Sequence, residues 1–294
     1  MNHVQDNAEE CIRNAIVNLK EGKYEYELDN GEYIRVRITI DKIKREATID
    51  FSGTAPKNPF NYNAPMAVCH AVILYVFRTL VGNNIPLNEG CFKPLNIIIP
   101  NNSMINAKYP SAVIAGNTEV SQLTCNALFG ALGVIAGSQA TMNNFIWGND
   151  KIQNYETICG GTGAGPNFHG TSAVQTHMTN TRSTDPEILE ARFPVRLEEY
   201  SIRKNSGGKG MFNGGDGVTR KLRFLEPMTV TTLCSHRKVQ PFGLNGGEPG
   251  QCGKEWLEKK DGKFIRLEGN DSCEVKVNDL FVMETPGGGG FGLK

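Results

Sequence analysis

The sequence lacks any excess of charge of one sign. Its 31 lysine and arginine residues are matched by 31 aspartate and glutamate residues, so the formal net charge at pH 7 is zero. Without a net positive field, the chain has no general attraction for nucleic acid or for an anionic membrane surface. We therefore expect neither nucleic acid nor a membrane as a partner.

Segments for export and membrane insertion are also missing. The first ten residues contain no basic start followed by an apolar run, so they do not resemble a signal peptide. No stretch is apolar for long enough to cross a bilayer. The eight cysteines include no Cys-x-x-Cys pair of the kind found in zinc and redox sites, and we expect most of them to be buried thiols. These features predict a reducing, cytoplasmic location.

Common nucleotide and hydrolase motifs are absent too. A P-loop needs Gly-x4-Gly-Lys-Ser/Thr, whereas Gly253-Lys254 is followed by glutamate. The glycines at 161, 163 and 165 have the wrong spacing for a dinucleotide fingerprint, and no helix is expected after them. The motif Gly-x-Ser-x-Gly, which marks the nucleophilic serine of α/β-hydrolases, does not occur in the sequence. The sequence thus predicts no nucleotide pocket in this chain.

What the first half of the chain does contain is clear periodicity. Apolar residues between positions 8 and 19 recur at helical spacing, and alternating strands follow around an Asn30-Gly31 hairpin turn. Residues 66–80 are apolar on nearly every face, which predicts a helix buried in a large domain. A short strand is expected over residues 95–99.

Another helix is expected to begin at Asn117 or Thr118 and to run to about residue 135. At the N-terminus of a helix the backbone N–H groups point outward and favour an anion. Because Glu119 would repel an anionic ligand, Asn117 and Gln122 are the better candidates for a ligand contact.

After Pro194 the chain becomes strand-like and rich in glycine. Glycine clusters at 206–217 and 286–292 predict loops or bulges. Strands are expected over residues 195–202, 218–225, 229–233, 274–277 and 279–284. The predicted fold is α+β: one large mixed domain over residues 1–294, with buried helices in the N-terminal half, a mostly β, glycine-rich C-terminal half and a possible sub-boundary near 190–205.

One stretch, residues 155–185, gathers most of the chemically useful side chains. It combines an acid, two imidazoles, an amide and a guanidinium, at Glu156, His169, His177, Asn180 and Arg182. The glycines between them, Gly160, Gly161 and Gly163, would permit positive φ and close approach of backbone N–H groups to a ligand. The acid and a histidine can exchange protons near neutral pH. A polar turn between two strands explains the same residues equally well.

This stretch resembles the hydantoinase B/5-oxoprolinase family, which includes the alpha subunits of acetone and acetophenone carboxylases. The likeness lies in Tyr-Glu-Thr-Ile-x-Gly-Gly-x-Gly-Ala and in His-Met-Thr-Asn-Thr-Arg-x-Thr-Asp, which ends at Asp185. Further blocks in family order occupy residues 51–54, 63–65, 85–91, 115–122, 206–210 and 285–292. Because these blocks span nearly the whole chain, the likeness is far more specific than any single glycine motif.

The resemblance implies the C-terminal part of a hydantoinase B or oxoprolinase subunit. Its reaction would be the ATP-dependent opening of a cyclic amide, typically 5-oxo-L-proline, a step of glutathione metabolism. A hydantoinase A-like ATPase subunit would bind ATP and phosphorylate the carbonyl oxygen, and this chain would hydrolyse the phosphorylated intermediate. Two alternatives stay open: a subunit of an ATP-dependent ketone carboxylase, and a truncated, non-catalytic subunit that only assembles with a partner.

The resemblance also implies a divalent metal, and here the sequence departs from the family. The motif credited with the metal, an Asn-Asp-Pro segment followed by Gly-x-His and a later histidine pair, lies upstream of the aligned portion. The one histidine before position 70 is His3. The metal ligands are therefore unknown, and the upstream half of the hydantoinase B subunit is an expected partner. A split gene, a decayed copy and a fragment all remain open explanations.

Under this resemblance the residues of the 155–185 stretch take specific roles. Glu156 and His177 would transfer protons, and Arg182 would bind a carboxylate or phosphate through two parallel hydrogen bonds. Asn180 and the backbone amides of residues 160–165 would contact the oxyanion.

Plainer explanations compete with these roles. An ion pair from Arg182 to Asp185 that pins the loop accounts for that arginine nearly as well. His236 and Arg237 form a weaker second pair of candidates, because a loop histidine is more often a surface residue. His70, on the apolar helix, is expected to be a satisfied core histidine rather than a ligand.

Overall fold

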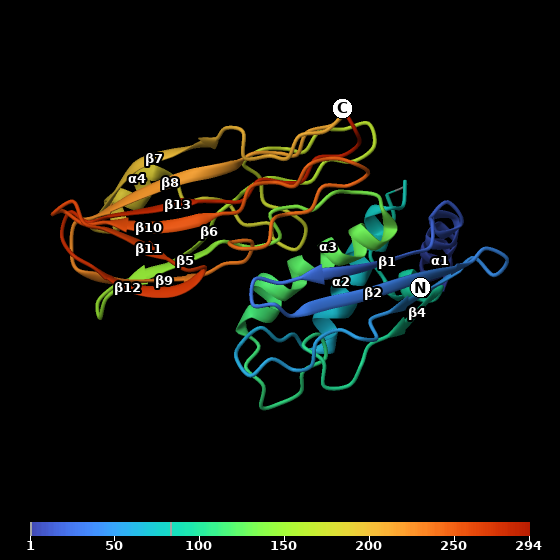
Figure 1. Cartoon of the computed structure of the whole chain (residues 1–294). Coiled ribbons are helices and arrows are strands. Elements are labelled where there is room, and N and C mark those ends of the chain that lie inside the picture. Colours follow the sequence, from blue (N-terminus) through green and yellow to red (C-terminus); the bar gives the residue numbers. More distant parts are fainter. Residues whose placement is uncertain (1, 83) are drawn as a thin grey trace. The chain divides into compact units, whose positions relative to one another are not determined.

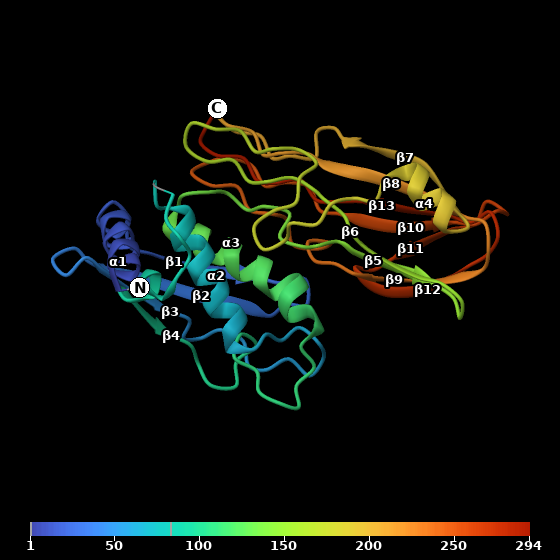
Figure 2. The ribbon, with the colours of Figure 1, turned by 180° about the vertical axis from the view of Figure 1, so that it is seen from behind.

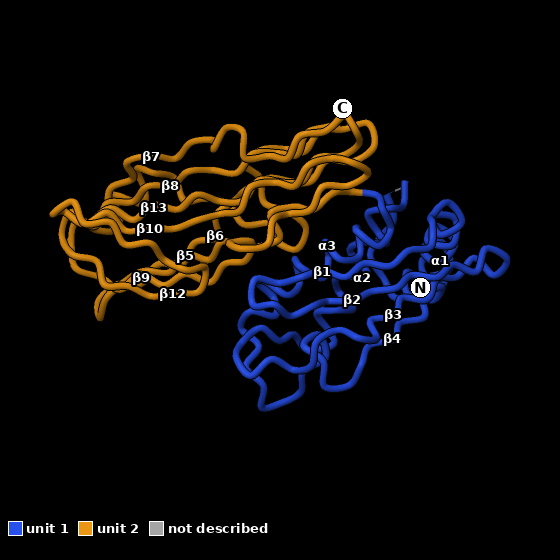
Figure 3. The backbone as a smooth tube through the Cα atoms, viewed as in Figure 1, with its two compact units in different colours: residues 1–134 blue, residues 135–294 orange. Residues whose placement is uncertain are grey.

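In a computed structural model, which describes residues 2–82 and 84–294, the chain forms two compact units, residues 1–134 and 135–294 (Figure 3). The division lies just after helix α3 (Ser121–Leu132). The possible sub-boundary near 190–205 instead falls inside unit 2. It does so because β7 (Val195–Arg203) pairs along its length with β8 (Gly217–Phe224), so the chain cannot part there. The predicted α+β class is confirmed.

A four-stranded sheet forms one layer of unit 1. Three antiparallel strands, β1 (Gly22–Glu27), β2 (Tyr33–Asp41) and β3 (Glu46–Asp50), are followed by β4 (Leu95–Ile98), which pairs in parallel with β3. Ile34, Val36 and Ile38 are buried on one face of β2, as the alternating pattern predicts.

Helices cover that sheet in unit 1 (Figure 2). Helix α3 packs on β1 and β2, and α2 (Met66–Thr79) packs on α3. Helix α1 (Asn2–Val17) lies against the 3-10 turn η1 (Glu89–Phe92). The helix predicted over residues 66–80 is therefore present as α2, but it packs on α3 and buries one face, with Cys69, Val72, Ile73, Val76 and Phe77.

The helix that contains Asn117 begins earlier than predicted. Residues 114 and 115 are already helical, and Gly116–Val120 forms a π-helical turn, η2, that continues into α3. The Thr118 hydroxyl bonds back to the Ile114 carbonyl at 3.4 Å instead of capping a helix. Asn117 thus lies in the first turn of this longer helical segment, whereas Gln122 is buried in α3, beyond that turn. An anion contact at Asn117 stays a prediction.

Unit 2 contains two antiparallel sheets that face each other (Figure 1). One sheet has the order β11 (Phe264–Leu267), β10 (Lys254–Glu258), β13 (Leu280–Glu284), β8, β7, and the other has the order β12 (Asn270–Val275), β9 (Met228–Leu233), β5 (Asn144–Gly148), β6 (Gln153–Thr157). The core lies between them, where the rings of Phe145 and Phe281 stack with their centroids 4.6 Å apart. The sequence patterns did not reveal β10 or β11.

The segment after β6 differs from the predicted strand, loop, strand. Within residues 158–185, all of which are described, isolated bridges such as Gly160–Val174 replace the second strand. Helix α4 (Pro186–Arg192) then begins as predicted: the Asp185 carboxylate accepts hydrogen bonds from the amides of Glu187 and Ile188, and proline occupies the first turn.

The glycine-rich segments of unit 2 run alongside one another beyond the strands (Figure 1). They bond through their backbones: the Gly161 amide donates to the Pro286 carbonyl at 3.1 Å, and the Gly288 amide donates to the Gly215 carbonyl at 2.9 Å. A Cβ atom on Gly161 would lie 2.0 Å from the Gly215 oxygen. Glycine is required here because backbones pack against each other with no space for a side chain.

Candidate functional site

A cavity of about 670 Å³ opens in unit 2 beside residues 173–183. Its wall combines this segment with Cys159 at the end of β6, Tyr200 on β7 and Val218 on β8. All of its lining residues are described, and among them Arg182 is the charged one. A cavity with a guanidinium and no carboxylate in its wall favours an anionic ligand.

Two of the four predicted catalytic side chains meet at this cavity. Asn180 and Arg182 both line it, and both are exposed to solvent. Their segment is tied to β6, because the Gln175 side-chain amide donates to the Thr157 carbonyl at 3.1 Å and the hydroxyls of Thr157 and Thr181 are bonded to each other. The backbone that carries these two polar groups is therefore held in place.

Tyr200 forms one wall of the cavity. Its hydroxyl is 3.1 Å from both the Cys159 sulfur and the Ser183 hydroxyl. Burial raises the pKa of Tyr200 to about 12 and also raises the pKa of Cys159 above its ordinary value. At neutral pH the phenol and the thiol are therefore both protonated, so Cys159 is a poor nucleophile.

Glu156 does not line the cavity but forms a buried ion pair next to it. Its carboxylate lies 2.7 Å from Nη2 of Arg220, whose side chain is 1% exposed. Arg220 in turn lies against the ring of Tyr200, with its guanidinium carbon 4.9 Å from the ring centroid. Burial raises the pKa of Glu156, and the charge of Arg220 opposes that rise. Glu156 is thus held by a counter-ion, which differs from the predicted proton-transfer role.

His177 is also outside the lining of the cavity. Its backbone has φ of 47°, in the left-handed region. Burial lowers the pKa of its imidazole to about 4, because the charged form is poorly solvated there. The imidazole is therefore neutral at physiological pH and a weak base, which differs from the predicted partnership with Glu156.

The backbone amides of Gly160 and Gly161 are not available as oxyanion contacts. The Gly160 amide donates to the Val174 carbonyl at 3.3 Å, and the Gly161 amide donates to Pro286. A Cβ atom on Gly163 would lie 1.8 Å from the Ala136 oxygen. None of these three glycines has positive φ. The predicted ligand contact would thus need other groups than the amides of Gly160 and Gly161, which bond within unit 2, while a contact at Gly163 stays a prediction.

The two remaining predicted contacts, Asn117 and Gln122, belong to unit 1. Asn117 is exposed on the π-helical turn, whereas Gln122 is fully buried in α3. His70, on α2, is partly buried, with its ring centroid 5.9 Å from that of Phe92.

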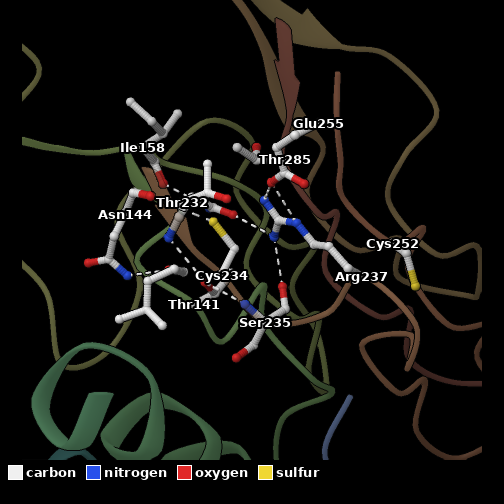
Figure 4. A network of polar contacts seen from close by, with 12 residues as sticks. Thr141, Asn144, Ile158, Thr232, Cys234, Ser235, Arg237, Cys252, Glu255 and Thr285 are labelled. Carbon is white, nitrogen blue, oxygen red and sulfur yellow. Dashed lines mark hydrogen bonds and ion pairs between the residues drawn. The ribbon is translucent and has the colours of Figure 1, made fainter. Parts of the chain in front are cut away.

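His236 is buried and Arg237 is partly buried, so neither is an exposed surface residue. His236 is 2% exposed, and its Nδ1 lies 2.6 Å from the Val239 carbonyl. Arg237 bonds to Glu255 at 2.8 Å through Nε and to Asn143 at 2.8 Å through Nη1 (Figure 4). This network ties the loop after β9 to β10, which gives the pair a structural role.

A metal site is not provided by the described side chains. Among residues 2–82 and 84–294, no group of three or more His, Cys, Asp or Glu side chains could hold a metal ion. The donor set that the family resemblance implies is therefore not found in this part of the chain. Over the same residues, no helix has both the length and the apolar character to span a membrane.

Sequence reasoning missed Tyr200 and Arg220, although one signal was present. Arg220 occupies a core-facing position in the alternation Val218, Arg220, Leu222 and Phe224 of β8. A charged residue at a position that the strand pattern assigns to the core needs a buried partner, and the partner lies 64 residues away at Glu156.

Comparison with known proteins places this geometry in a family. The model of the hydantoinase B/oxoprolinase family matches residues 1–294. The 5-oxoprolinase of Dictyostelium discoideum is 42% identical over 304 residues, which cover 100% of this chain and 24% of that protein. The chain thus spans about a quarter of the length of this curated relative.

Two solved structures share the fold. The ATP-dependent caprolactamase of Pseudomonas jessenii superposes with a TM-score of 0.82 at 21% identity, over 98% of this chain and 54% of that one. A nucleotide-free acetone carboxylase gives a TM-score of 0.84 at 16% identity, over 97% and 47% of the two chains. With the family model matched from end to end, the chain belongs to the hydantoinase B/oxoprolinase family.

Proposed function

We propose that this chain is a component of an ATP-dependent cyclic amide hydrolase that opens 5-oxo-L-proline or a hydantoin. The similarity to a 5-oxoprolinase over the whole chain supports this proposal. The observation that carries it in the structure is a cavity with Arg182 and Asn180 in its wall and no carboxylate among its lining residues. Such a wall suits an anionic ligand, because the guanidinium can pair with its negative charge and the Asn180 side chain can donate a hydrogen bond to its amide oxygen.

The proposed chemistry depends on activation of the amide. A cyclic amide resists water because its C–N bond is resonance-stabilised, and phosphorylation of the carbonyl oxygen removes that resistance. Water then attacks the carbonyl carbon, the ring C–N bond breaks as the nitrogen takes a proton, and a second water displaces phosphate from the acyl phosphate. The chain has to bind the intermediate, orient water and stabilise negative charge.

Individual residues contribute to these tasks in different ways. Arg182 would bind a carboxylate or phosphate through its planar fork. Asn180 would donate to the developing oxyanion, and the neutral Tyr200 would form the wall between the ligand and Arg220. Glu156 would neutralise the buried charge of Arg220 without touching the ligand, and His177, a weakened base outside the lining of the cavity, would not exchange protons with the ligand.

The proposed assembly includes further polypeptide. ATP would be bound by a hydantoinase A-like ATPase subunit, and the upstream half of the hydantoinase B subunit would supply the metal ligands. The 24% share of the 5-oxoprolinase that this chain matches supports the need for such additional parts.

Reconstitution tests the proposal. The chain is combined with the ATPase and with the upstream half, and ADP release is measured with 5-oxo-L-proline, with a hydantoin and with acetone. We expect release that depends on a cyclic amide, and we expect Arg182→Lys to raise the KM for that substrate about tenfold. ADP release that depends on acetone alone would show that the chain belongs to a ketone carboxylase. ADP release that does not require this chain would show that the chain is a non-catalytic subunit.

A further inference from the structure

Arg220 has hydrogen-bonding capacity that unit 2 does not use. Its ion pair with Glu156 engages Nη2, which bonds to both carboxylate oxygens at 2.7 and 3.0 Å. The other two donor nitrogens, Nε and Nη1, are buried and have no hydrogen-bond partner. A guanidinium that is 1% exposed thus keeps donors on two of its three nitrogens unbonded.

Leaving the buried N–H groups of Arg220 unbonded destabilises the folded chain unless an acceptor from outside the chain binds them. A buried donor without an acceptor costs about 1–3 kcal/mol, and more when it belongs to a charged group. Nearly all buried polar groups in folded proteins have a partner. The free donors of Arg220 therefore call for an acceptor that the chain itself does not provide. Arg220 is not in the lining of the cavity, but its neighbours Tyr200 and Val218 are.

Tyr200 separates Arg220 from that cavity. Its ring lies against the guanidinium, 4.9 Å from centroid to carbon, while the same residue lines the cavity. Val218, two positions from Arg220 on the same face of β8, also lines it. Tyr200 is 37% exposed, and its fixed contacts at the tip are the hydroxyl bonds to Cys159 and Ser183. Turning the ring outward would break these two hydroxyl contacts and its contact with the Arg220 guanidinium.

We propose that the cavity holds a second oxyanion subsite, in which one of the unbonded N–H groups of Arg220, on Nε or Nη1, binds a carboxylate or phosphate group once the Tyr200 ring turns aside. Arg182 binds the other anionic group of the same ligand. The identity of the ligand rests on the proposed function, because a phosphorylated cyclic-amide acid carries both a phosphate and a carboxylate. The subsite makes Arg220 a ligand-binding residue, while Glu156 stays on Nη2 as the counter-ion whose negative charge opposes that of the ligand.

Calorimetric titration of the full chain with inorganic phosphate and, separately, with 5-oxo-L-proline tests the subsite without any ATPase. Glu156→Gln removes the opposing negative charge and should tighten anion binding at least fivefold. The pair Arg220→Met with Glu156→Gln removes both charges, so no ion is left buried alone, and should weaken binding at least tenfold relative to Glu156→Gln. Whichever anion responds identifies the group that occupies the subsite.

A surface pair on the same strand is the matched control. Arg223 bonds to Glu198 at 2.6 Å, and Arg223→Met with Glu198→Gln should leave anion binding unchanged. Tyr200→Ala uncovers Arg220 and should tighten the binding of the same anion that responds to Glu156→Gln, and unchanged affinity for that anion would overturn the role of Tyr200. If Glu156→Gln fails to tighten the binding of either anion, the subsite is wrong. If the variants respond as expected but reconstitution gives no cyclic-amide hydrolysis, the proposed function fails and the subsite stands.

Discussion

The glycine-rich segment 160–165 and the segment 173–183 that follows it have opposite roles in unit 2. In the first, backbone amides donate to neighbouring segments, and Gly161 is packed so closely that a Cβ atom would lie 2.0 Å from the Gly215 oxygen. In the second, Asn180 and Arg182 extend into solvent along a cavity. The contrast teaches that glycine serves close packing in this protein, whereas the groups that can meet a ligand are side chains on the later segment.

The largest expected effect tests the packing half of this comparison. Gly161→Ala places a methyl group against two backbone atoms, at 2.0 and 2.5 Å, that no side-chain rotation can move away. We expect the free energy of unfolding to fall by about 4 kcal/mol, above the usual range for overpacking. Urea denaturation measures it. Gly82→Ala, where a Cβ atom would meet nothing within 4 Å, is the control and should change stability by less than about 0.5 kcal/mol.

The next effect concerns the ion pair next to the cavity. Arg220→Met leaves the Glu156 carboxylate buried without its cation and should cost about 3 kcal/mol at pH 7 to 8. Burial already raises the pKa of Glu156, and loss of Arg220 raises it further. The carboxyl is then neutral at mildly acidic pH, so the deficit should shrink as pH falls through that raised pKa. A deficit that stays constant from pH 8 to pH 4.5 in urea denaturation would contradict the pairing.

A smaller effect tests the ligand-facing half. Arg182→Lys keeps the positive charge but loses the planar fork, so 5-oxo-L-proline should bind about tenfold more weakly. Because Arg182 is exposed, the free energy of unfolding should change by less than about 0.5 kcal/mol. Calorimetric titration and urea denaturation of the same samples give both values. A large loss of stability with unchanged binding would show that Arg182 stabilises the fold and does not contact the ligand.

The smallest expected effect concerns His177, whose pKa is lowered to about 4 by burial. Because this pKa is lower in the folded than in the unfolded chain, His177 makes its full contribution to the free energy of unfolding above pH 6.5, the pKa in the unfolded chain. That contribution is lost as the pH falls from there toward about 4. His177→Asn suits the φ of 47° and removes the titration, so its stability should depend less on pH in that window. Urea denaturation from pH 7 to pH 4 measures this, and identical profiles for both proteins would show that His177 titrates normally.

Much of the fold could be predicted because its signals are local. The alternation in β2 and the apolar run of α2 follow from residues a few positions apart, and Asp185 with Pro186 marks the start of α4. A helix start is also local, but Asn117 misled the prediction. A threonine or asparagine that looks like a cap can equally bond backward inside a helix, as Thr118 does.

The candidate site could be predicted only in part, because most of its contacts are not local. Arg182 and Asn180 were found as polar residues in one short span, and the structure places both at one cavity. The partner of Glu156 is 64 residues away in sequence, and Gly161 meets Pro286 from the end of the chain. Composition cannot show whether a glycine amide faces a ligand or a neighbouring carbonyl.

The central claim is that a ligand binds beside residues 173–183 and not in the glycine loop. Backbone amide chemical shifts of the full chain, recorded while 5-oxo-L-proline is added, test it most directly. The account predicts shifts that saturate at Asn180, Arg182 and Ser183 and at Tyr200, with residues 160–163 unchanged. Saturating shifts at Gly160, Gly161 and Gly163, with none at Asn180 or Arg182, would contradict it.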